Sequence, residues 1–164
     1  ELIQKKSDYI FTDKSLENFF YLGLIKKIFP DAKIINCKRN ATSSIMSIFK
    51  RNLGDIIWAH NLDNIFKYFD IYNHLTKKFK KLFPDFIYEL HYEQLVNEPE
   101  IESKKLLNFC NLEWDKNCLA FYNNKRGIIT ASFVQARKPI YKSSVKSWQK
   151  YKNELSSLFK ILDS

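Results

Sequence analysis

Glycine is scarce in this sequence, and its scarcity limits how the protein can bind a phosphate group. The 164 residues include three glycines, Gly23, Gly54 and Gly127, which lie far apart. A phosphate loop built from backbone amides needs several glycines within a few residues. Neither familiar Gly-rich pattern can form here, so any phosphate site must use side chains and helix ends.

Cysteines and long apolar runs are also few. The three cysteines, Cys37, Cys110 and Cys118, show no C-x-x-C spacing, which argues against a metal site or a disulfide framework. This pattern is typical of a reducing compartment, so we expect a cytoplasmic protein. No apolar run approaches the length of about 18 residues that a membrane span requires. The amino terminus is neither a signal peptide nor a start with Met, and we expect it to lie within a longer protein.

Acidic residues are outnumbered by basic ones, 18 to 27, which gives a net charge of +9. This excess indicates an anionic partner such as a nucleotide, a nucleic acid or an acidic surface. The alternative is a compositional bias toward Lys, Asn, Ile and Phe. Because 45% of the residues are hydrophobic and 16% are aromatic, the chain is expected to fold, and its length fits one domain over residues 1–164.

Short apolar runs alternate with helical patterns along the first part of the chain. Residues 9–12 predict a strand, 15–29 a helix, 33–38 a second strand and 41–51 a second helix. Later segments follow the same patterns: a helix over 62–83, a strand over 86–92, a helical turn over 93–96, and helices over 99–110 and 115–122. Strands and helices that alternate with short connections predict an α/β fold with a parallel sheet.

The stretch from Lys33 to Arg51 has the strongest functional signal. Arg39 closes the predicted strand, and the helix that follows carries Ser47 and Arg51, four residues apart and therefore on one face. Two guanidinium groups and a hydroxyl near a helix N-terminus form a candidate phosphate site. The alternatives are an ion pair at the strand end for Arg39 and a solvated side chain for Arg51.

Four blocks, in this order, resemble PAPS-dependent sulfotransferases, where PAPS is 3′-phosphoadenylyl sulfate. They are YIFTDKSLENFFYLGLIKKIFPDAKII, CKRNATSSIMSIFKR, HYEQLVNEP followed by LLNFCNLEWD, and TASFVQARKPIYKSSVKSWQKY. The resemblance is strongest to the bacterial branch often fused to tetratricopeptide repeats and to the related tyrosylprotein sulfotransferases. One block alone is moderately specific, whereas four blocks with the right spacing are a strong signal.

The resemblance covers the C-terminal two-thirds of such a domain. It implies a three-layer α-β-α sandwich around a parallel sheet, similar to P-loop nucleoside triphosphate hydrolases, but lacking the first strand and the phosphate loop. The family's Pro-x-Ser-Gly-Thr-Thr segment and its usual catalytic base, a Glu or a His, are absent from this sequence. We therefore expect a partial sulfotransferase-like domain of a longer enzyme, whose base stays unassigned.

Family roles carry over to the residues that match. The resemblance implies that Arg39 and Ser47 bind the 3′-phosphate of the nucleotide, and Arg51 matches a second arginine of the tyrosylprotein branch. Tyr92 matches a tyrosine that contacts the nucleotide near its adenine. The stretch 132–141 resembles a loop that closes over the phosphates, with these matching polar positions: Ser132, Gln135, Arg137 and Lys138.

The implied catalytic residues are Lys14 and Ser132, placed near the bridging oxygen of the sulfate. Sulfuryl transfer resembles phosphoryl transfer, and negative charge builds up on the leaving phosphate, where a cation and a hydroxyl stabilise it. A base must also take the proton of the acceptor.

The predicted function is transfer of a sulfuryl group from PAPS, without a metal, to a hydroxyl or an amine. The acceptor can be a carbohydrate, a peptide or a small molecule. The alternative is a degenerate, non-catalytic member of the family that binds a nucleotide or a partner. A nucleic-acid partner ranks last, because no recognisable nucleic-acid-binding module occurs in the sequence.

Overall fold

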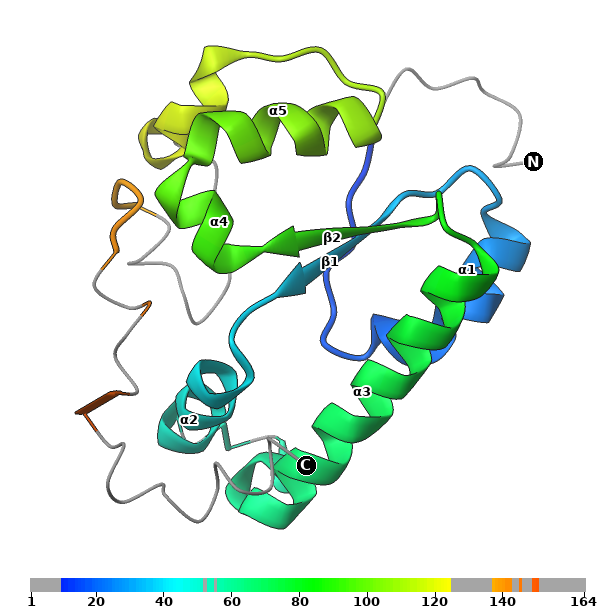
Figure 1. Ribbon diagram of the computed structural model, residues 1–164, viewed down its shortest axis with the longest axis vertical. Coiled ribbons are helices and arrows are strands. Elements are labelled where there is room, and N and C mark those ends of the chain that lie inside the picture. The colour runs from blue at the N-terminus through cyan, green and yellow to red at the C-terminus, as the bar shows by residue number, and fades with distance from the viewer. Residues whose placement is uncertain are drawn as a thin grey trace.

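The computed structural model describes residues 10–51, 53–54, 56–124, 137–142, 145 and 149–150. Its elements follow in chain order: η1 (Asn18–Tyr21), α1 (Leu22–Ile28), β1 (Ile34–Lys38), α2 (Ala41–Arg51), η2 (Ile57–His60), α3 (Leu62–Leu82), β2 (Ile87–His91), α4 (Tyr92–Asn97), α5 (Pro99–Phe109) and η3 (Lys116–Asn123), where η marks a 3-10 helix (Figure 1). Helices and strands thus mix along the chain, as the sequence predicts.

The two strands form a small parallel sheet. Their register runs from the pair Ile34–Ile87 to the pair Lys38–His91. A parallel pair needs a long crossover connection, which α2 and α3 supply here. Both strands point their carboxyl ends toward α2 and α4 (Figure 1). The parallel sheet is confirmed, whereas the three-layer sandwich stays a prediction, since the described part of the chain shows two strands.

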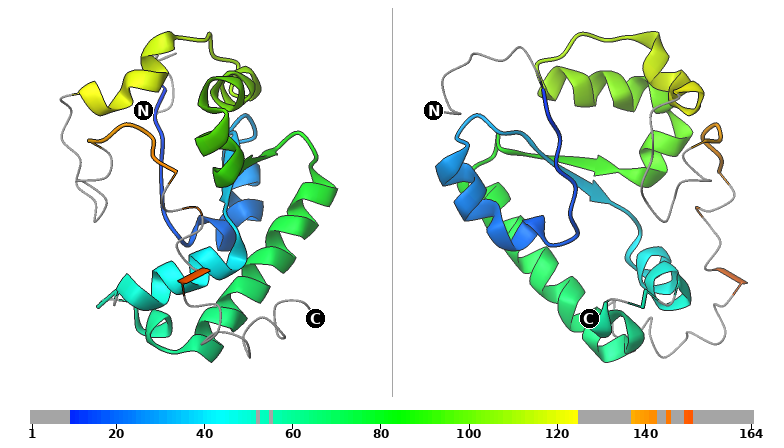
Figure 2. Two further views of the ribbon diagram at one scale, coloured as in Figure 1. Left: turned by 60° about the vertical axis from the view of Figure 1, so that its left-hand side comes forward. Right: turned by 180° about the vertical axis from the view of Figure 1, so that it is seen from behind.

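Helices α1 and α3 cover one face of this sheet and α5 lies on the other side (Figures 1 and 2). The core of the first face is a cluster of four buried side chains: Phe19, Leu22, Phe86 and Ile87. Aromatic residues of α3 surround this cluster, and the ring centroids of Phe19 and Tyr72 lie 5.4 Å apart in an edge-to-face contact. Together these contacts hold α1 and α3 to one side of the strands.

The other face of the sheet packs against α5. The rings of Tyr88 on β2 and Phe109 on α5 are 5.2 Å apart between centroids. Glu102, which is buried on α5, forms an ion pair of 2.6 Å with Lys105. A buried carboxylate needs such a partner, because an unpaired buried charge is strongly unfavourable.

Within the described ranges, no helix combines the length and apolarity that a bilayer crossing demands.

The strand predicted over residues 9–12 is wrong where it can be checked. Residues 10–12 form no strand, residue 9 lies outside the described ranges, and Ile10 and Phe11 are 70% and 81% exposed. An apolar run becomes a strand only where another strand can pair with it, and neither described strand does so here. The segment 10–17 instead crosses behind the sheet in Figure 1 and in front of it in the right panel of Figure 2.

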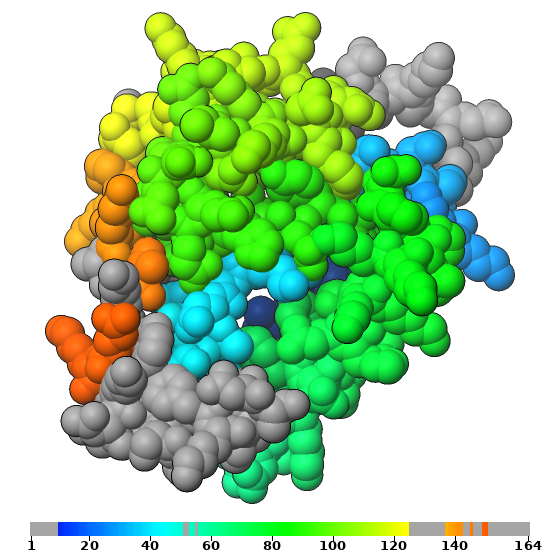
Figure 3. Space-filling model, in the orientation of Figure 1, coloured from blue at the N-terminus to red at the C-terminus, as the bar shows by residue number. Residues whose placement is uncertain are grey.

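This crossing segment is held mainly at its carboxyl end. The hydroxyl of Tyr68 on α3 donates a hydrogen bond of 3.1 Å to the carbonyl oxygen of Leu16. Figure 3 shows the segment, in dark blue, at the floor of a hollow between the cyan surface of β1 and α2 and the green surface of α3. The helix predicted over residues 15–29 begins later, as η1, and continues as α1.

Glu89 on β2 forms ion pairs with two lysines, one on β1 and one on α3. Its carboxylate lies 3.1 Å from the Nζ of Lys38 on β1 and also forms an ion pair with Lys80 on α3. Burial alone raises the pKa of Glu89, but hydrogen bonds and charge from Lys80 and Lys38 outweigh it, so the pKa is lowered from its ordinary value. Folding therefore favours the ionised carboxylate of Glu89.

Leu22→Ala tests the apolar core. The side chain of Leu22 is 2% exposed, so its truncation leaves a cavity and lowers the free energy of unfolding by about 2–5 kcal/mol. Leu24→Ala is the matched control on the same helix, because Leu24 is 54% exposed, and it is expected to change stability by less than about 0.5 kcal/mol. Urea denaturation followed by circular dichroism measures both. Equal losses would contradict the assigned core.

Glu89→Gln tests the two ion pairs. Because the pKa of Glu89 is lowered in the folded state, its stabilisation is present above the ordinary glutamate pKa of about 4.3 and is lost as the pH falls through the lower, folded value. The variant should lose about 1 kcal/mol at pH 7, since the pairs are partly exposed, and the difference from wild type should shrink in acid. A difference independent of pH would refute this assignment.

The control for Glu89→Gln is Glu100→Gln. Glu100 pairs with Lys104 four residues away on α5, and the two side chains are about half exposed. Exposed helical pairs of this kind contribute about 0.2–0.5 kcal/mol, so this variant should unfold almost like wild type. Thermal unfolding at pH 7 compares the two variants directly.

Candidate functional site

The corner between β1 and α2 forms the candidate site. Strand β1 ends at Lys38 and α2 begins at Ala41, so Arg39 and Asn40 make the connection. The side chain of Asn40 caps α2, because its Oδ1 accepts a hydrogen bond of 3.0 Å from the backbone N–H of Ser43. Such a helix N-terminus carries partial positive charge, and Arg39 adds a guanidinium beside it. The corner can therefore attract an anion.

The second strand brings an aromatic ring to this corner. Because Lys38 pairs with His91, the next residues, Arg39 and Tyr92, leave the sheet side by side. The guanidinium carbon of Arg39 lies 5.0 Å from the centroid of the Tyr92 ring. This cation–π contact limits the orientations that the guanidinium can take. The structure thus brings together two of the residues predicted for nucleotide binding.

A contact that the sequence did not predict lies one residue further along. The backbone N–H of Asn40 donates a hydrogen bond of 2.9 Å to the Oε1 of Glu93 on α4. The half-buried side chain of Glu93 thus connects the second strand–helix junction to the first. The signal for Glu93 in the sequence was weak, since it is only a Glu directly after the tyrosine of the HYEQ block. Its partner, Asn40, becomes evident only from the strand register.

Ser47 lies further along α2 and is half-buried. It is about 9 Å from the first residue of the helix along its axis, given the rise of an α-helix. Ser43 and Ser47 are four residues apart and share a face of α2. The Oγ of Ser43 donates a long hydrogen bond of 3.5 Å to the carbonyl oxygen of Val145, so this face meets the carboxyl-terminal part of the chain.

Arg51 is the last residue of α2, and its side chain lies outside the described part.

The predicted closing loop is described only in part. Ser132 and Gln135 lie outside the described ranges, whereas Arg137 is half-buried and Lys138 is exposed. The segment 137–142 lies on the same side of the molecule as α2 and α4, toward which the strands point (Figures 1 and 2). The closing of this loop over the phosphates stays a prediction.

Lys14 lies in the segment 10–17 and is exposed. A short link fixes the turn around it, because the Nδ2 of Asn18 donates a hydrogen bond of 2.8 Å to the Oδ2 of Asp13. Lys14 therefore lies in a turn that a side-chain link fixes, within the segment that crosses the sheet.

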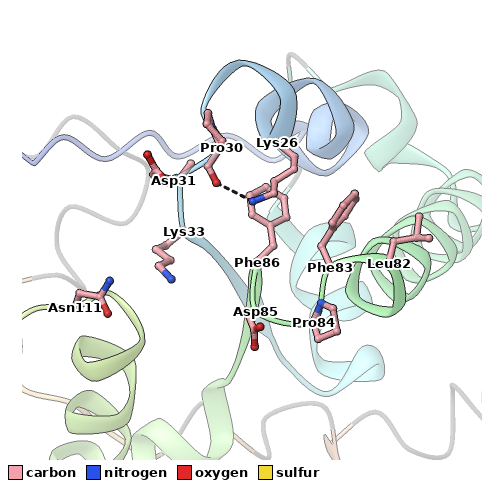
Figure 4. A pocket seen from close by; sticks show the side chains of 11 residues that line it. Lys26, Pro30, Asp31, Lys33, Leu82, Phe83, Pro84, Asp85, Phe86 and Asn111 are labelled. Atoms are coloured by element: carbon pink, nitrogen blue, oxygen red, sulfur yellow. Dashed lines mark hydrogen bonds between the residues drawn. The ribbon is translucent and has the colours of Figure 1, made fainter.

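A pocket of about 610 Å³ lies at the opposite, amino-terminal ends of the strands (Figure 4). Its charged lining residues balance each other: Lys26, Lys33, Asp31 and Asp85. Lys26 also donates a hydrogen bond of 2.7 Å to the carbonyl oxygen of Pro30. Ligands of parallel α/β sheets bind beyond the carboxyl ends of the strands. We therefore place the candidate site at the corner of β1 and α2.

Comparison with known proteins shows which family the chain resembles over most of its length. The model of a family described as "Sulfotransferase family" matches residues 2–116. An uncharacterised protein of Aquifex aeolicus is 40% identical over 154 residues, which is 92% of this chain and 20% of the relative. The chain thus spans about a fifth of the length of that relative. Because the family match includes both strands and every helix through α5, the chain belongs to the sulfotransferase family.

Proposed function

We propose that this chain binds PAPS and transfers its sulfuryl group to a hydroxyl or an amine, as part of a longer enzyme. The observation that carries the proposal is the contact between Arg39 and Tyr92 beside the capped N-terminus of α2. Membership of the sulfotransferase family supports the transfer of a sulfuryl group. A nucleotide donor with a free phosphate fits a cationic corner with an aromatic ring next to it.

In the proposed complex the corner holds the 3′-phosphate of the donor. Arg39 offers two parallel N–H groups to one phosphate, which is the geometry in which arginine binds such groups most strongly. The hydroxyl of Ser47 and the guanidinium of Arg51 add donors from α2. Tyr92 orients Arg39 and presents ring surface near the adenine. The residues of the closing loop cover the phosphates from the other side: Ser132, Gln135, Arg137 and Lys138.

The proposed reaction breaks the bond between sulfur and the bridging oxygen and forms a bond between sulfur and the acceptor. Negative charge develops on the bridging oxygen of the departing nucleotide, so Lys14 and Ser132 lower the barrier by donating hydrogen bonds to it. The acceptor proton passes to a general base that this proposal leaves unassigned.

The finer assignments belong to the same proposal. The arginine that follows Ser47 by four residues supports a relation to the tyrosylprotein sulfotransferases and to the bacterial branch associated with tetratricopeptide repeats. The parallel pair β1 and β2 supports a P-loop-like, three-layer fold for the complete domain, to which residues 1–164 contribute a part. The acceptor class, whether carbohydrate, peptide or small molecule, stays open.

Calorimetric titration with 3′-phosphoadenosine 5′-phosphate tests nucleotide binding. Arg39→Ala removes the two donors and the positive charge, so we expect the affinity to fall at least about tenfold, or by about 1.4 kcal/mol. Lys27→Ala is the charge-matched control, because Lys27 is exposed on α1, and its affinity should equal that of wild type. Equal binding by wild type and Arg39→Ala would show that the corner is not the phosphate site.

A second candidate is nucleotide binding without transfer, because no general base is assigned among these 164 residues. Formation of 3′-phosphoadenosine 5′-phosphate from PAPS by the complete protein, measured with hydroxyl and amine acceptors present, separates the two candidates. A transferase should lose activity by about a hundredfold in Lys14→Ala, because one donor to the developing charge is removed, while nucleotide affinity stays within about twofold. A wild-type protein that binds the nucleotide but never cleaves PAPS would support the non-catalytic candidate.

A further inference from the structure

The strand register continues beyond the sheet through two side-chain contacts. The last backbone pair is Lys38–His91, the next step is the cation–π contact of Arg39 with Tyr92, and the third step is the hydrogen bond from Asn40 to Glu93. Both chains leave their strands and enter helices at this point. The two junctions are therefore joined residue by residue.

Asn40 is fixed on both sides by these contacts. Its backbone N–H donates to Glu93 on α4, while its side chain accepts from Ser43 on α2. Asn40 also directly follows Arg39 in the chain, so its position decides where the Arg39 backbone turns out of the sheet. The carboxylate of Glu93 thus acts on two parts of the candidate site, the start of α2 and the base of the Arg39 side chain.

The charge of Glu93 is a disadvantage at this place. A carboxylate near a phosphate site repels the ligand, and its ion–ion repulsion is felt over several ångströms. The hydrogen bond itself requires only an acceptor oxygen at the right distance, which a neutral amide also supplies. The hydrogen bond to Asn40 therefore depends on the length of the Glu93 side chain and not on its charge.

We infer that Glu93 is a positioning residue: by accepting the backbone N–H of Asn40, it fixes the strand–helix corner from which Arg39 meets the phosphate of the nucleotide. This inference rests on the proposed function and adds to it a residue that touches neither the phosphate nor the reacting atoms. The length of the Glu93 side chain, and not its charge, is the property that holds Asn40 in place.

Two variants separate the effect of side-chain length from the effect of charge. Glu93→Gln keeps an acceptor at the same distance and loses the charge, whereas Glu93→Asp keeps the charge and withdraws the oxygen by one methylene. Glu93→Ala removes both properties, and Gln94→Ala is the control at an exposed position of the same helix. Circular dichroism verifies that each variant folds, and the conservative pair keeps the test valid if Glu93→Ala does not fold.

Two readouts are measured on the full chain: hydrogen exchange of the Asn40 amide by nuclear magnetic resonance, and the affinity for 3′-phosphoadenosine 5′-phosphate by calorimetry. In Glu93→Asp and Glu93→Ala the amide should exchange faster and the affinity should fall about tenfold, as expected for the loss of one hydrogen bond that fixes the corner. Glu93→Gln should match wild type or bind more tightly, and Gln94→Ala should match wild type in both readouts.

Each contrary result has a distinct meaning. If wild type binds the nucleotide and Glu93→Asp and Glu93→Ala bind it equally well, the positioning role is wrong and the proposed function stands. If Glu93→Gln weakens binding as much as Glu93→Asp, the tether to Asn40 is not the cause and the inference is also overturned. If wild type fails to bind the nucleotide, the proposed function falls, and this role falls with it.

Discussion

The parallel register between β1 and β2 is the constraint on which the candidate site depends. It sets Lys38 beside His91, and because both strands end there, it also decides which residues meet at the two exits. A shift of one residue would turn every side chain of a strand to the opposite face and separate Arg39 from Tyr92. The apolar packing of α1 and α3 on one face, with α5 on the other, resists such a shift.

Charge in this protein has two different uses. Lys38 and Lys80 hold Glu89 and so join β1, β2 and α3, which means that they contribute to the fold. Arg39, one residue beyond Lys38, lies on an aromatic ring at the start of a helix. The net charge of +9 therefore does not measure how strongly the chain attracts an anion, because part of it is committed to internal carboxylates. What distinguishes the corner is its geometry and not the number of its charges.

Much of the secondary structure could be predicted because apolar periodicity is a local property. The helix predicted over residues 41–51 has those bounds in the structure, and the helix predicted over 62–83 ends one residue earlier. The strand predicted from the apolar run 9–12 was wrong because a strand exists only with a partner, and residues 10–12 pair with neither described strand.

Of the site, Arg39 and Tyr92 were predicted from their blocks. Glu93 was not predicted, since it accepts a hydrogen bond from a backbone N–H that is 53 residues away in the sequence.

By itself, the sequence determined the alternation of helices and strands, the absence of a Gly-rich phosphate loop, and the strand–helix corner that carries Arg39, Ser47 and Arg51. These features are set by neighbouring residues, whose side chains act on their own turn of helix or length of strand. Only the tertiary structure decided that Tyr92 lies against Arg39 and that Glu93 holds Asn40. The physical reason is that both contacts follow from the pairing of two strands distant in sequence, and no local pattern encodes a register.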